Sequence, residues 1–194
     1  SLPHYPPVPV GVAFDWPGRK SRYYAWGHPD GNNCTRDEGY TQLLRVWASD
    51  RTVLFHNAKF DLEVATTHLS LPDLAWSRVH DTLFLLFLHN PHAASLSLKP
   101  ASEKLLGLPP EEQDAVRQWL IDHKIVRADD KGWGAHIASA PGNVVAPYAI
   151  GDVVRTRKLF NLLYSKNRGE AYDRERRLLP VLRRSERDGL RVDV

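Results

Sequence analysis

The chain has 194 residues, of which 42% are hydrophobic and 25% charged, values typical of a globular domain. Its single cysteine, Cys34, excludes an internal disulfide and a zinc site built from paired cysteines, and it suits a reducing compartment. The formal net charge is +3, and the longest apolar run, residues 83–88, is too short to span a bilayer, so we expect no membrane partner.

The N-terminal half alternates between strand and helix patterns. Residues 9–16 and 20–28 are rich in β-formers and flank a turn signal at Asp15–Gly18, which predicts a hairpin. The elements predicted next are a helix over 37–49, a strand over 52–55, a helix over 58–69 with Asn57 as its N-cap, a strand over 79–82, and an apolar helix through Leu88.

The C-terminal half has only helical patterns. They cover residues 96–106, 110–123, 147–165 and 170–187, while residues 124–146 are expected to form a loop because they are rich in glycine and proline. The order of strands and helices predicts an α/β fold with a mixed sheet.

Two polar clusters contain candidate functional residues. Asn57 and Asp61 follow a buried strand and lie four residues apart, so they can share one helix face at the sheet edge where α/β folds bind ligands. Each also has a structural interpretation, Asn57 as a helix cap and Asp61 as an acid favoured in a first helical turn.

The second cluster has the same spacing. Tyr148 and Asp152 lie four residues apart on a partly apolar helix, and a buried carboxylate is costly unless it is paired or holds a metal. The structural alternative is that Asp152 bonds Arg155 or Arg157 and that Tyr148 belongs to the core.

Together the clusters resemble the second and third motifs, Asn-x-x-Phe/Tyr-Asp and Tyr-x-x-x-Asp, of DEDD-type 3′→5′ exonucleases of the tyrosine subclass. The spacer segments 80–82, 97–99 and 104–107 and the tail over 172–193 are similar as well. The resemblance is closest to the proofreading exonuclease domain of phage-like family A DNA polymerases, and it covers essentially the whole chain.

This resemblance implies a ribonuclease H-like mixed sheet flanked by helices and two divalent metal ions, Mg²⁺ or Mn²⁺, which prefer oxygen ligands. By position, Asp61 and Asp152 would be metal ligands, and Tyr148 would orient the attacking water as the third catalytic residue. Asn57, Lys59 and Phe60 would line the path of the single-stranded 3′ end of the DNA.

The first motif of the family, Asp-x-Glu on the central strand, is not found. In the family that the chain resembles, this motif is followed by a short loop and a strand similar to residues 9–14, so the resemblance implies that the motif, with two further acidic ligands, lies upstream of Ser1. We therefore expect a fragment whose central first strand is missing and which is inactive alone. Residues 1–166 would be the N-terminally truncated exonuclease domain, and residues 167–194 the start of the DNA polymerase domain, its partner in cis.

The resemblance implies work in the cytoplasm of a bacterium or of a phage-infected host, and no pattern indicates an oligomer. Residues 1–165 have 17 basic and 17 acidic side chains, and residues 166–194 have 9 and 6, so all the net basicity is in the tail. Its helix could be a solvated face or could hold duplex phosphates.

Two other functions are compatible with these motifs. One is a non-catalytic DNA-binding module with a decayed metal site, and the other is a ribonuclease of the same tyrosine subclass. The tail over 186–194 favours a polymerase over a helical RNA-binding domain.

Overall fold

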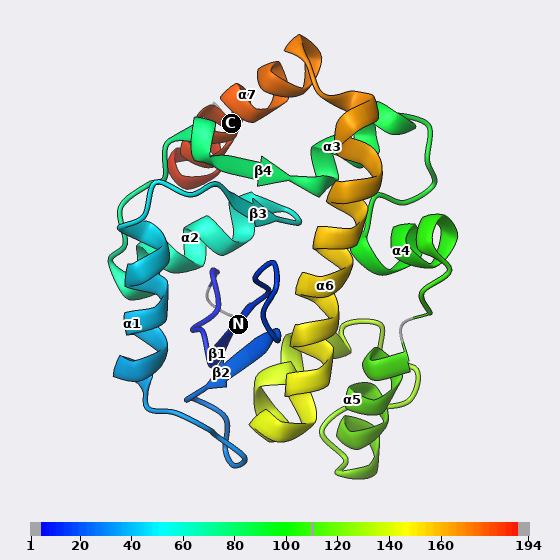
Figure 1. Ribbon diagram of the computed structural model, residues 1–194. Coiled ribbons are helices and arrows are strands. Elements are labelled where there is room, and N and C mark those ends of the chain that lie inside the picture. Colours follow the sequence, from blue (N-terminus) through cyan, green and yellow to red (C-terminus); the bar gives the residue numbers. More distant parts are fainter. Residues whose placement is uncertain (1–4, 110, 190–194) are drawn as a thin grey trace, which may run out of the picture.

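The computed structural model describes residues 5–109 and 111–189, and Figure 1 shows helices around two small sheets. In chain order the elements are β1 (Gly11–Phe14), β2 (Arg22–Ala25), α1 (Arg36–Trp47), β3 (Val53–Phe55), α2 (Ala58–Leu69), the 3₁₀ helix η1 (Trp76–Arg78), β4 (Val79–Asp81), α3 (Thr82–His89), α4 (Leu98–Leu106), α5 (Glu111–Asp122), the 3₁₀ helix η2 (Trp133–Ser139), α6 (Gly142–Asn167) and α7 (Glu170–Asp188).

The α/β class predicted from the sequence is confirmed, and so is the hairpin. β1 pairs antiparallel with β2, and β3 pairs parallel with β4, with Phe55 opposite Asp81. Within the described residues these strands form two separate two-stranded sheets instead of one mixed sheet. The ribonuclease H-like arrangement therefore stays a prediction. The tail residues 190–194, which belong to the segment that carries the resemblance, lie outside the described residues.

Helix α6 is the longest element and packs against α3, α4, α5, both hairpin strands and β3 (Figure 1). The prediction that it begins at Pro147 is wrong, because the helix begins at Gly142 and continues through the proline. Gly142 permits this start: a Cβ there would lie 2.6 Å from the Gly31 carbonyl oxygen. The expected loop over 124–146 is also wrong in part, since it contains η2 and the first turn of α6.

Helix α7 shares the core of the preceding elements. Tyr172 of α7 is 1% exposed and packs in one cluster with Leu85, Leu159 and Leu163 of α3 and α6. Leu179 joins a second cluster with Leu62 of α2 and other apolar residues. The helix that sequence analysis assigned to the next domain is thus buried against this one.

Side chains of α7 also cover the free edge of β4. The Arg176 Nε donates to the Val79 carbonyl at 2.7 Å, and the Tyr172 hydroxyl accepts the Asp81 N–H at 3.1 Å. Unpaired strand edges invite association with other chains, and these bonds satisfy this edge internally.

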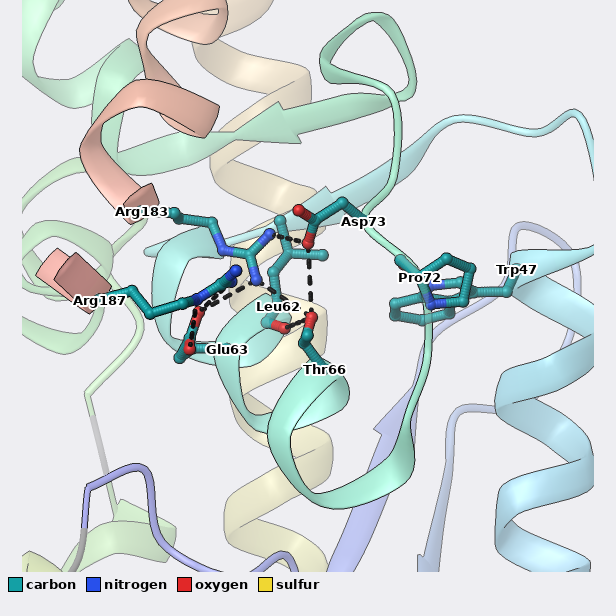
Figure 2. A network of polar contacts seen from close by, with 8 residues as sticks. All are labelled: Trp47, Leu62, Glu63, Thr66, Pro72, Asp73, Arg183 and Arg187. Atoms are coloured by element: carbon teal, nitrogen blue, oxygen red, sulfur yellow. Dashed lines mark hydrogen bonds and ion pairs between the residues drawn. The ribbon is translucent and has the colours of Figure 1, made fainter. Parts of the chain in front are cut away.

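Further along α7, Arg183 and Arg187 bind α2 and the loop after it (Figure 2). Arg183 bonds Glu63 at 3.1 Å and Asp73 at 2.5 Å, and Arg187 bonds the same Glu63 at 3.1 Å. Arg176 and Arg183 are only 7% and 5% exposed. These two arginines are therefore neither a solvated face nor available to DNA.

Within the described ranges, no helix is both long enough and apolar enough to cross a membrane.

Candidate functional site

A buried carboxylate organises the ends of the parallel strands. Asp81, the last residue of β4, is 2% exposed, and its oxygens accept the backbone N–H groups of Asn57 at 2.9 Å, Ala58 at 2.7 Å and Leu83 at 2.8 Å. One side chain thus caps both α2 and α3, where the helix dipoles favour a negative charge. Burial raises the pKa of Asp81, and the three N–H bonds oppose that rise.

The predicted N-cap position of Asn57 is confirmed, but its side chain does not make the capping bond. Asn57 occupies the N-cap position in the left-handed conformation, with φ of 66°, and its side chain makes no capping bond. Asparagine tolerates this backbone better than most residues. Because Asp81 does the capping, the amide of Asn57 is free to line an adjacent cavity.

Asp61 lies in the first turn of α2, close to two other acids. The residue as a whole is exposed, yet the protein around its carboxylate disfavours the charged form. That desolvation raises the pKa of Asp61 to about 7, and the negative charges of Asp81 and Asp152 add to the rise. Asp61 and Asp152, predicted from separate motifs, are therefore close enough to interact.

Asp152 has a partner that sequence analysis did not assign. Lys99 of α4 places its Nζ 3.1 Å from Oδ1 and 3.4 Å from Oδ2 of Asp152. The predicted alternative, a bond to Arg155 or Arg157, is wrong: Arg155 pairs with Glu112 and Arg157 with Asp15.

Burial raises the pKa of Asp152, and the charges of Lys99 and Arg155 counteract part of that rise. Lys99 belongs to one of the spacer segments that carry the resemblance. Its spacing from Asp152 along the chain gave no signal that the two side chains meet.

Tyr148 lies one turn before Asp152 on α6 and is half-buried. The Lys99 ammonium sits over its ring, 3.6 Å from the centroid, and the Trp133 ring approaches it edge-on at 6.5 Å. Lys99 therefore contacts both of the functional residues predicted on α6. Tyr148 also packs against an apolar cluster. The structural alternative, that Tyr148 belongs to the core, is therefore correct for part of this side chain.

The three residues predicted to contact DNA line one cavity. Asn57, Lys59 and Phe60 surround a space of about 310 Å³ together with Tyr5 and Glu186. Phe60 and Tyr5 are 37% and 66% exposed, and their ring centroids are 6.3 Å apart. A larger cavity of about 500 Å³, between α5 and residue 129, contains none of the predicted site residues.

The donor atoms at Asp61 and Asp152 are suited to a hard divalent cation. Mg²⁺ and Mn²⁺ take carboxylate oxygens, and a dication would neutralise the negative charges of Asp81 and Asp152 that add to the desolvation of Asp61. In the part of the chain that the structure describes, no group of three or more histidine, cysteine or acidic side chains could hold a metal. The two carboxylates therefore fit part of a metal site and do not complete one.

Comparison of the sequence with models of known protein families and with curated proteins finds no match.

Proposed function

We propose that this chain is the 3′→5′ proofreading exonuclease domain of a family A DNA polymerase of the phage-like kind. It would remove nucleotides from single-stranded 3′ ends of DNA, with the polymerase domain following in cis. The observation that carries the proposal is that the negative charge of Asp152, on α6, contributes to the raised pKa of Asp61, on α2, so the two predicted ligands from separate motifs lie within electrostatic range of each other.

In this proposal each predicted residue has a separate task. Asp61 and Asp152 hold the divalent cations, and Tyr148, one turn from Asp152, orients the attacking water. Asn57, Lys59 and Phe60 bind the terminal nucleotides in their common cavity. When bound, a pair of cations supplies water activation and stabilisation of the leaving 3′ oxygen.

The arrangement of the strands supports the same proposal. α6 packs against both hairpin strands and against β3, so one helix covers both two-stranded sheets. A central strand bearing the Asp-x-Glu motif that the resemblance implies would join the two sheets. It would also supply the acids that Asp61 and Asp152 lack.

A second candidate is a non-catalytic DNA-binding module of the same fold. The observation that favours it is Lys99, whose ammonium already partners Asp152. A carboxylate neutralised by an internal cation needs no metal ion. In that case the cavity at Asn57 would still hold a DNA strand, without hydrolysis.

Alanine substitutions in the longer parent protein separate the two candidates. Asp61→Ala and Asp152→Ala should each abolish the release of nucleotides from a 5′-labelled strand in Mg²⁺ while polymerisation continues. Asp50→Ala, which alters an exposed acid, is the control and should keep both activities. Unchanged degradation in the Asp152→Ala protein would refute the site, and a parent protein without any exonuclease activity would favour the binding module.

A further inference from the structure

The cavity beside α2 has the chemical character of a nucleotide site. Its lining combines two exposed aromatic rings, one amide, one cation and one acid: Tyr5, Phe60, Asn57, Lys59 and Glu186. Exposed aromatic side chains next to a cation are the usual means of holding a single strand, because bases stack on the rings and phosphates pair with the cation.

The two rings of the cavity are in contact with each other. The centroids of Tyr5 and Phe60 are 6.3 Å apart, with 57° between the ring planes, a tilted arrangement typical of an aromatic pair. A base between two parallel rings needs about 6.8 Å, because stacked bases are about 3.4 Å apart. A base would therefore stack on Phe60 only after the Tyr5 ring, which is 66% exposed, has turned away.

The cation of this cavity already has an anionic partner. The Lys59 ammonium forms an ion pair with the carboxylate of Glu186, near the end of α7. Among the described residues that line the cavity, Glu186 is the one acid. Its side chain is 51% exposed and that of Lys59 is 29% exposed, and ion pairs this accessible are worth about 0–1 kcal/mol. A phosphate can therefore replace the carboxylate at low cost.

Glu186 is held in place by its helix. It follows Arg183 by three residues, so the two share a face of α7, and Arg183 is anchored to Glu63 and Asp73. Figure 2 shows Arg183 and Arg187, from neighbouring turns of α7, both reaching Glu63. The charge of Glu63 is thereby balanced by two arginines.

We infer that Glu186 occupies the place of a nucleic-acid phosphate on Lys59, and that a single strand entering the cavity exchanges its phosphate for this carboxylate. The strand's base then stacks on Phe60. This inference rests on the proposed function and adds regulation of the site. Glu186 of α7, the last described helix, competes with the substrate for Lys59.

A binding measurement without metal tests the exchange. The 194-residue chain is titrated, in EDTA, into a 5′-fluorescein-labelled pentathymidylate, and anisotropy gives the Kd. Glu186→Gln should tighten binding by about fivefold, the equivalent of the upper value for an accessible pair. The matched control is Asp188→Asn, which removes the same charge from the same helix but pairs with Arg184 instead. It should change the Kd by less than about twofold.

Variants of Lys59 provide a second test in the same binding measurement. Lys59→Gln should weaken binding, and the double variant Lys59→Gln/Glu186→Gln should bind no more tightly than Lys59→Gln alone, because the carboxylate then has no cation to mask. The three substituted positions are at the surface, and circular dichroism verifies that each variant keeps its fold.

Equal effects of Glu186→Gln and Asp188→Asn would overturn the exchange, as would a gain that persists without Lys59. Absence of binding by every variant would overturn it too. None of these results depends on hydrolysis, which EDTA prevents. The proposed exonuclease activity is judged separately, by the alanine variants of the parent protein in Mg²⁺.

Discussion

At the scale of single residues, three carboxylates determine the electrostatics of the site, and each has different neighbouring groups. Hydrogen bonds from three backbone N–H groups stabilise the Asp81 carboxylate. An ion pair with the Lys99 ammonium stabilises the Asp152 carboxylate. Desolvation raises the pKa of Asp61 to about 7, and the charges of its two acidic neighbours, Asp81 and Asp152, add to that rise. Sites of this kind lower the stability of the fold in exchange for binding or catalysis.

Asp61 should make the stability of the chain depend on pH. In the unfolded chain it titrates near 3.8 and in the folded chain near 7. Between these values the folded state keeps a proton that the unfolded state has released, so this contribution to stability falls as pH rises from about 4 to 7. Asp61→Asn should therefore raise the melting temperature at pH 8 and leave it nearly unchanged at pH 4.

Scanning calorimetry at both pH values measures this difference, with Asp50→Asn as the exposed control. A melting temperature that Asp61→Asn shifts equally at pH 4 and pH 8 would contradict the assigned environment of Asp61.

Lys99 should stabilise the metal-free chain through Asp152. Its side chain is 12% exposed and that of Asp152 is 29% exposed, so Lys99→Met leaves a partly buried carboxylate without its partner, at a cost of about 1–3 kcal/mol. Lys104→Met, at an exposed position of the same helix, should stay within about 0.5 kcal/mol of the wild type. Urea unfolding measures both.

The same variant tests whether Asp152 binds a cation. Added Mn²⁺ should stabilise the Lys99→Met protein more than the wild type, because the ion no longer competes with the ammonium. Identical urea midpoints with and without Mn²⁺ in both proteins would speak against a metal ligand at Asp152 and for the non-catalytic module.

At the scale of elements, α7 has two roles that its sequence pattern does not separate. One face buries Tyr172, Arg176, Leu179 and Arg183 against the domain, and Glu186 near its end lies at the cavity. Six of its residues are arginines, a composition typical of a solvated or nucleic-acid-binding helix, but the two buried arginines have partners within the chain.

Arg183 should be the arginine of α7 whose loss matters most for docking on α2. Arg183→Met removes the partner of Glu63 and Asp73 and should cost about 2–3 kcal/mol, at the lower end for a broken buried pair because Asp73 is 58% exposed. Arg184→Met, which breaks an exposed i,i+4 pair with Asp188, should cost at most about 0.5 kcal/mol.

Urea denaturation of the two variants gives this comparison directly. Equal, small losses would mean that the pairs of Arg183 with Glu63 and Asp73 contribute little to the docking of α7.

At the scale of the whole molecule, local patterns predicted more than long-range contacts did. The hairpin follows from its turn signal, and α2 lies where its helical spacing predicts it, although Asp81 makes the capping bonds in place of the Asn57 side chain. The capping by Asp81 and the pairing of Lys99 with Asp152 join segments far apart in the chain, and no local pattern specifies such pairs. The early start of α6 depends on the close approach of Gly142 to Gly31, which is likewise a tertiary contact.

The same reasoning applies to the candidate site. Asp61 and Asp152 could be selected from the sequence because each belongs to a motif with helical spacing, and the structure brings them near one another. Tyr5 and Glu186 could not, because they enter the cavity from the two ends of the described chain.

The central proposal is that Asp61 and Asp152 are ligands of a metal-dependent exonuclease site, to which the Asp-x-Glu motif implied by the resemblance would add the other acids. The most direct test measures nucleotide release from a 5′-labelled single strand in Mg²⁺ by two proteins. One is the 194-residue chain, and the other is the same chain extended by about thirty upstream residues. We predict stepwise shortening from the 3′ end by the extended protein, none in EDTA, and little or none by the 194-residue chain. Equal activity of the two proteins, or no activity in either, would contradict the account.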